Sequence, residues 1–120
     1  MKIRKIKTVE YILKNELEET KPSKFYLTDL NPYQAADVYD ILTKNGSVTL
    51  NINVMIKAAE LGISDWKNVM DDKKQFKFSK TNILSLPVEV LSEIGVEVLK
   101  NSFPEFAEVL GAEEDKENLE

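Results

Sequence analysis

Apolar residues recur every three to four positions over residues 3–19, with charged residues between them. This spacing predicts an amphipathic helix. Residues 2–7 also alternate between charged and apolar types, so a short edge strand is the competing interpretation there. Pro22 then interrupts the pattern and predicts a loop, and an apolar patch over residues 25–30 precedes the next element.

A second helix has a clear start signal. Asn31 can accept hydrogen bonds from the unpaired N–H groups of a first turn, and Pro32 suits the first helical position, where no N–H is needed. The pair Asn45-Gly46 is predicted to close this helix, because Gly tolerates a left-handed backbone.

A third helix and a hairpin follow. Either Ser47 or Asn51 can cap the helix, and Gly62 is predicted to end it. Period-two apolar spacing on both sides of the charged run 71–74 then predicts a short β-hairpin around residues 66–78.

The last part of the chain reads as helical. Ser79 can cap a short turn, and Ser85 with Pro87 predicts the start of a helix that runs to about Asn101. Pro104 restarts a short amphipathic piece. Together these patterns predict a mainly α fold, a small helical domain of about four to five helices with one short β-hairpin. The domain is expected to cover residues 1–110, followed by an acidic, disordered tail over residues 111–120.

The composition narrows the chemistry that this chain can perform. Its 120 residues include no Cys and no His, which excludes disulfides, cysteine nucleophiles and every Ser-His or Cys-His arrangement. The four Gly residues are scattered, so no phosphate-binding glycine loop is present. The length suits one domain, and 42% hydrophobic residues are enough for a core without metal or disulfide.

Charge is unevenly distributed along the chain. Residues 111–120 hold five acids and one Lys, residues 1–7 hold four basic side chains, and the whole chain carries a net charge of -5. This balance disfavours nucleic-acid binding, which needs a basic surface. No stretch is typical of a signal peptide or of a membrane span, so we expect a soluble cytoplasmic protein that binds no membrane.

The remaining candidates for catalysis are carboxylates. Asp71 and Asp72 are adjacent in the predicted turn, which is typical of solvated charges rather than of an acid-base pair. Together with Asp65 they lack the alternating oxygen ligands and the glycine of a calcium loop. We therefore predict no catalytic residue, no metal ligand, no cofactor and no enzymatic activity. A carboxylate pair assembled from distant elements is the one arrangement left open.

Aromatic residues supply the candidates for protein binding. Tyr26, Tyr33 and Tyr39 could form a partner surface, since Tyr is enriched at interfaces, although half-buried packing on helices explains them equally well. Trp66, the one Trp of the chain, is expected to pack under the hairpin as a core anchor.

A pattern of turn and packing residues runs through residues 61–91. A helix ends at Gly, a Trp-x-x-Val strand leads into an acidic turn, a Phe-Ser pair follows, and Leu-Pro opens a final helix. This pattern resembles that of small tailed-bacteriophage proteins of the tail assembly chaperone type. It departs from them at Lys73 and Lys74, where similar proteins often have Gly. The matching positions are Gly62, Trp66, Asn68, Val69, Asp72, Phe78, Ser79, Asn82, Leu86 and Pro87.

The resemblance implies a non-enzymatic viral protein, encoded by a bacteriophage or prophage, that acts in the cytoplasm of the bacterial host. Its implied partners are the tail tube subunit and the tape measure protein, which it would bind before they polymerise. A near-neutral apolar body is compatible with reversible masking of a partner's hydrophobic surface. Homo-oligomer formation is left open.

Two other classes of protein are alternatives. One is a structural virion protein, such as a head-tail joining or tail-terminator subunit. The other is a small regulatory or antitoxin-type protein, for which the basic residues 2–7 are the only hint.

Overall fold

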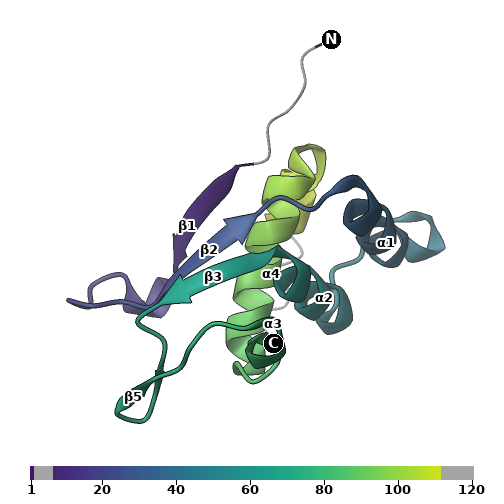
Figure 1. Ribbon diagram of the computed structural model, residues 1–120. Helices are drawn as coiled ribbons and strands as arrows, with labels where there is room; N and C mark the ends of the chain where they lie inside the picture. The colour runs from purple at the N-terminus through teal and green to yellow at the C-terminus, as the bar shows by residue number, and fades with distance from the viewer. Residues whose placement is uncertain (2–6, 112–120) are drawn as a thin grey trace.

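A three-stranded antiparallel sheet with helices against one of its faces organises the protein (Figure 1). The computed structural model describes residue 1 and residues 7–111. Strand β1 (Thr8–Ile12) pairs with β2 (Lys24–Thr28), and β2 pairs with β3 (Ile63–Lys67). The strand order β1-β2-β3 therefore places β2 in the centre.

The central strand alternates buried and half-buried residues. Phe25 and Leu27 are buried on the helix side, while Lys24, Tyr26 and Thr28 are half-buried on the other side. This period of two is that of a strand with one face on the core and the other toward solvent. The pairing with β3 shifts between Tyr26 and Leu27, which marks a β-bulge at that point.

Helix α1 (Pro32–Leu42) begins at the predicted cap. The Asn31 side chain accepts a hydrogen bond from the Gln34 N–H at 2.9 Å, and the Gln34 side chain accepts one from the Asn31 N–H at 3.0 Å, which completes a capping box. The predicted left-handed glycine is also confirmed, because Gly46 has φ 81. It closes a separate 3₁₀ turn, η2 (Lys44–Gly46), rather than α1 itself.

Helix α2 (Ile52–Gly62) is capped by Asn51, whose side chain accepts a main-chain hydrogen bond at 2.9 Å. It ends at Gly62, as predicted, and Gly62 also has a packing role. A Cβ added at Gly62 would lie 2.6 Å from the two methyl carbons of Val98, which belongs to α4 (Val88–Ser102). Gly62 thus makes room for a helix that follows much later in the chain.

Helices α2 and α4 approach each other closely where they cross. A Cβ added at Gly95 would lie 2.0 Å from the main-chain oxygen of Met55, so only glycine fits there. Around this crossing Ile94, Val98 and Leu99 are almost fully buried. These residues belong to the hydrophobic core cluster that also includes the helix-facing residues of the sheet.

The predicted hairpin is present, with very short arms. Strands β4 (Met70–Asp71) and β5 (Lys74–Gln75) pair antiparallel across a two-residue turn. After the hairpin, the Ser79 side chain accepts from the Asn82 N–H at 3.0 Å and caps the short helix α3 (Lys80–Ile83), as predicted. The hairpin projects away from the sheet and the helices (Figure 1).

Two 3₁₀ turns complete the described elements. Turn η1 (Lys14–Glu16) follows β1, and turn η3 (Pro104–Phe106) follows α4. Residues 107–111 are helical again. The predicted restart at Pro104 is thus confirmed.

The prediction of a mainly helical fold is wrong. Residues 8–12 form a strand instead of part of a helix over residues 3–19, and residues 24–28 form the central strand where only a loop and an apolar patch were expected. Both segments are strands because their main chains pair, so that each supplies the hydrogen-bond partners of the other. Residues 2–6, where helix and strand were both considered, lie outside the described residues.

Two further differences concern the limits of elements. Trp66 lies in β3 of the main sheet rather than in an arm of the hairpin. Helix α4 starts at Val88 with no side-chain cap, so the capping role predicted for Ser85 is wrong. The predicted disordered tail falls almost wholly on residues 112–120, which lie outside the described residues.

Candidate partner-binding surface

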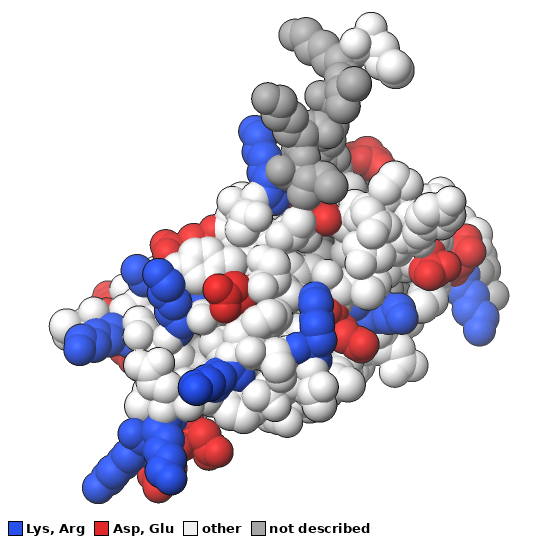
Figure 2. Space-filling view, in the orientation of Figure 1, with Lys and Arg blue, Asp and Glu red and all other residues white. Residues whose placement is uncertain are grey.

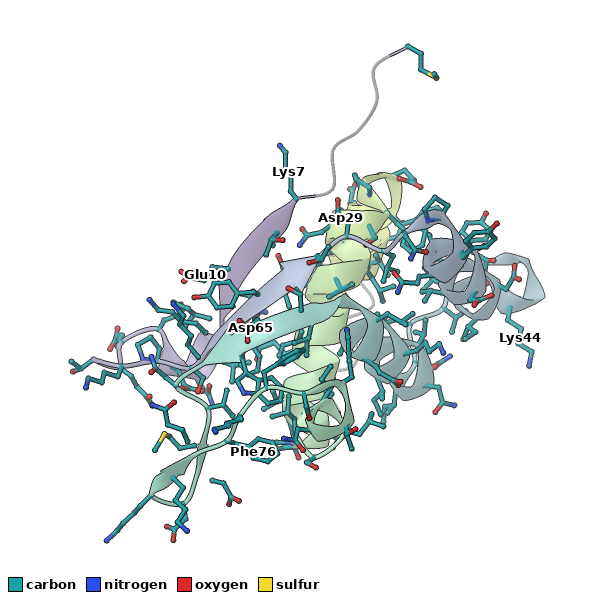
Figure 3. The ribbon with its side chains drawn as sticks, in the orientation of Figure 1. Lys7, Glu10, Asp29, Lys44, Asp65 and Phe76 are labelled. Atoms are coloured by element: carbon teal, nitrogen blue, oxygen red, sulfur yellow. The ribbon has the colours of Figure 1, made fainter. Side chains whose placement is uncertain are left out.

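Tyr26 lies on the face of the sheet that is turned away from the helices. It is paired in register with Glu10 of β1 and Asp65 of β3, and Figure 3 shows these two acids on the same side of the sheet. The Tyr26 hydroxyl donates to Glu10 Oε1 at 3.5 Å, and the Lys67 ammonium lies 5.8 Å from the centre of the Tyr26 ring. Tyr26 is therefore part of a polar, cross-strand surface.

Tyr33 and Tyr39 both belong to α1 but differ in their surroundings. The Tyr33 side chain is 87% exposed, whereas Tyr39 is 44% exposed. The Tyr39 ring packs against Phe103 and Phe106, with ring centres 6.2 and 6.0 Å away. Tyr39 thus helps to hold the segment that follows α4 against α1, while the Tyr33 side chain is mostly in solvent.

The three tyrosines do not form one surface. Tyr39 follows Tyr33 by six positions, which places them on different sides of the helix. Figure 1 shows α1 well apart from the middle of β2, where Tyr26 lies. A binding surface made of all three side chains is not supported by this arrangement.

Trp66 is buried in the core, as predicted, but it packs against the segment that follows the hairpin rather than under the hairpin itself. Its side chain is 5% exposed, and its indole N–H donates to the main-chain oxygen of Phe76 at 2.6 Å. The rings of Phe25, Phe76 and Phe78 surround it, with centres 6.0, 5.8 and 5.1 Å away. Trp66 joins the sheet to the segment that returns from the hairpin, which Figure 3 shows at Phe76.

Asn68 connects the end of β3 to the loop before β2. It adopts φ 61, a left-handed conformation that Asn tolerates better than most residues. Its side-chain N–H donates to the Pro22 oxygen at 3.2 Å, and its main-chain oxygen accepts from the Ser23 hydroxyl at 3.1 Å. Asn68 therefore has a structural role.

Other residues of the phage-like pattern also have structural roles. The Val69 oxygen accepts from the Phe76 N–H at 2.7 Å and extends the hairpin. Asp72 has φ 57 in the hairpin turn, so it adopts the left-handed conformation that a glycine would take there. Pro87 precedes α4, and Leu86 beside it is half-buried. These residues of the pattern thus contribute to how residues 61–91 fold.

Apolar residues that were not predicted to be exposed lie between the end of α3 and the start of α4. The Leu84 side chain is 57% exposed and Val88 is 46% exposed. Pro87 is exposed between them, and Leu86 is half-buried. We call the group Leu84, Leu86, Pro87 and Val88 the Leu-Pro surface. Leu86 packs against the hydrophobic core, while Leu84 and Val88 remain exposed beside it.

The acidic side chains are placed as the sequence indicated. Asp71 and Asp72 are exposed in the hairpin, and Asp65 is exposed on the outer face of the sheet. Within residue 1 and residues 7–111, no group of three or more acidic side chains is arranged to hold a metal ion.

Comparison with protein-family models, curated proteins and solved structures finds no match to this chain. Among the helices that the structure describes, none is both long enough and apolar enough to cross a membrane. The residues and surfaces described above are therefore the basis for inferring a function.

Proposed function

We propose that this protein is a non-enzymatic phage tail assembly chaperone that binds the tail tube subunit, the tape measure protein or both during tail morphogenesis. The resemblance in residues 61–91 motivates the proposal. The observation that carries it is the Leu-Pro surface, because Leu84 and Val88 expose apolar side chains within that same segment. A protein that masks a partner's hydrophobic surface needs such a surface of its own.

The surroundings of the Leu-Pro surface suit reversible binding. Ile83, just before it, is fully buried, and Leu91, just after it, is 3% exposed. The exposed side chains are thus held between two anchored positions, so little further ordering is needed when a partner binds. A small apolar surface on a rigid support favours an interaction that can be released when the tail polymerises.

Co-purification from phage-infected cells tests this function. We expect tagged wild-type protein to recover the tail tube subunit or the tape measure protein. A variant with both Leu84→Ser and Val88→Ser should recover much less of them. Leu17→Ser is the matched control, because Leu17 is 64% exposed but belongs to a different part of the chain.

Two results would contradict the proposal. One is a folded wild-type protein that recovers no tail protein, or that recovers the same amount with the Leu-Pro surface altered. The other is the presence of this protein in purified phage particles in amounts that match a structural subunit. That result would favour a virion protein such as a head-tail joining or tail-terminator subunit.

A further inference from the structure

The projecting hairpin and its flanks form the most basic segment that the structure describes in full. Residues 67–80 contain five Lys and two Asp, for a net charge of +3. All five lysines are exposed. Figure 2 shows Lys or Arg side chains at the tip of the hairpin, beside acidic ones. We call residues 67–80 the basic arm.

Not all of these lysines are free to bind a partner. The Lys80 ammonium donates to the Ile63 main-chain oxygen at 3.0 Å, close to the end of α2, and Lys67 lies over the Tyr26 ring. In contrast, the ammonium groups of Lys73, Lys74 and Lys77 form no ion pair or hydrogen bond within the part of the chain that the structure describes. These three cations are available to an anionic partner.

The basic arm does not suit a nucleic acid. Binding of single strands uses exposed aromatic rings on which bases stack, but the rings of Phe76 and Phe78 pack against Trp66. Asp71 and Asp72 at the hairpin would also repel a phosphate chain. The arm therefore fits a short acidic peptide, whose carboxylates can approach single lysines and avoid the two acids.

The chain itself contains such a peptide. Residues 81–120 hold ten acids and two lysines, for a net charge of -8, and residues 112–120 alone contribute -4 of this. The last described turn, residues 107–111, lies near the far end of α4, away from the hairpin (Figure 1). The last described residues before the acidic segment thus lie away from the basic arm (Figure 1). Contact with the arm of a second molecule therefore requires no return of the segment across its own molecule.

We propose that the basic arm of one molecule binds the acidic segment 112–120 of a second copy of the chain. The two surfaces are different, so the contact is head-to-tail and leaves an arm free at one end and an acidic segment free at the other. Such an assembly grows with protein concentration and weakens with salt, because its charges are exposed and screened. The proposal is independent of the phage function proposed above.

Sedimentation velocity over a range of protein concentrations tests this proposal. At low ionic strength, about 0.02 M, we expect the wild-type protein to form species larger than the monomer, and at about 0.5 M salt we expect it to dissociate. A triple variant Lys73→Glu, Lys74→Glu and Lys77→Glu should weaken association by about tenfold or more. The changed side chains are exposed, and circular dichroism verifies that the fold is kept.

A matched control and a charge exchange make the test specific. Lys2→Glu, Arg4→Glu and Lys5→Glu also reverse three basic charges, but they lie far from the arm in the sequence, and association should persist. Glu113→Lys, Glu114→Lys and Glu117→Lys should weaken association as the arm variant does, and an equal mixture of the arm and tail variants should restore it.

Three outcomes would overturn the proposal. The first is a wild-type protein that stays monomeric at low salt. The second is an equal loss of association in the control with altered residues 2, 4 and 5. The third is a mixture of the two reversed variants that does not associate.

Discussion

The α2–α4 crossing and strand β1 are held in place by different kinds of interaction. At the crossing the two backbones meet so closely that a Cβ at Gly95 would lie 2.0 Å from the Met55 oxygen. Strand β1 lies at an edge of the sheet, with Thr8, Val9 and Glu10 all exposed. Its other end is tied to α4 by Glu93.

This difference indicates which part of the fold can open locally and which cannot. Close-packed backbones cannot move apart without losing many contacts at once, so a disturbance at the crossing affects the whole domain. An edge strand held by pairing on one side and by a few polar contacts can open locally while the core stays intact. We expect changes at the crossing to lower global stability, and changes around β1 to act mainly on the sheet edge.

Gly95→Ala should have the largest effect. The added methyl group would overlap main-chain atoms of Met55, so the helices must separate, and we expect the free energy of unfolding to fall by about 3 kcal/mol. Urea denaturation measures this fall in the free energy of unfolding. Gly111→Ala is the control, because nothing lies within 4 Å of the added Cβ, and it should cause no loss. A Gly95 variant as stable as the wild-type protein would show that the crossing is not tight.

Glu93→Ala should have the next largest effect, on β1. The Glu93 carboxylate accepts from the Tyr11 hydroxyl at 2.6 Å and from the Lys14 N–H at 2.9 Å. Its removal should cost about 2 kcal/mol, because both donors lose an ionised acceptor. Hydrogen exchange should accelerate at the amides of β1 more than at those of α2.

A double-mutant cycle isolates the contact between Tyr11 and Glu93. Tyr11→Phe alone removes one donor, so the double variant should lose less stability than the sum of the two single variants. Strictly additive losses would indicate that the hydrogen bond contributes nothing, and that Glu93 acts on β1 in another way.

Changes at Asn68, between β3 and the hairpin, should have a smaller effect on stability. Its φ of 61 is unfavourable for a residue with a Cβ. Asn68→Ala and Asn68→Gly both lose the side-chain hydrogen bond to Pro22, but only Ala also carries the backbone penalty. The Gly variant should therefore be more stable than the Ala variant by about 1 kcal/mol in thermal or urea unfolding. Equal stabilities would show that this backbone position is not strained.

Elements with nearby partners could be predicted from the sequence. The caps at Asn31 and Ser79 form hydrogen bonds to residues three positions ahead, so their signals are local. The hairpin turn was also found at the right place, since its charged residues lie together. In each case the interaction is complete within a few neighbouring residues.

Strand β1 could not be predicted in this way. Its pairing partner β2 begins twelve residues after β1 ends, and Glu93 is 82 residues from Tyr11. Apolar residues spaced by three or four positions fit a helix equally well until those partners are known. The same limit applies to Gly62: the end of α2 there was predicted correctly, but the closeness of Val98 of α4 could not be.

The candidate surface was predicted less well than the fold. Tyr enrichment at interfaces indicates a residue type, not the side of an element on which it lies. Tyr39 packs on Phe103 and Phe106 because of where the chain returns after α4. In the same way, Leu84 and Val88 are exposed although nearby Ile83 and Leu91 are buried. Both facts depend on tertiary structure.

The smallest effect is expected for the ion pair between Lys24 and Glu10, which tests whether the outer face of the sheet helps to hold the edge strand. Lys24 lies 3.8 Å from Glu10 Oε1, and these side chains are 37% and 45% exposed. Solvent screens such a pair, so Glu10→Gln or Lys24→Gln should change the free energy of unfolding by less than about 0.5 kcal/mol. Urea unfolding at low and high salt measures this. A loss above about 1 kcal/mol would mean that the outer face itself holds β1 in place. Because Glu93 acts from the opposite side of the sheet, losses at both sites would make β1 as firmly held as the crossing.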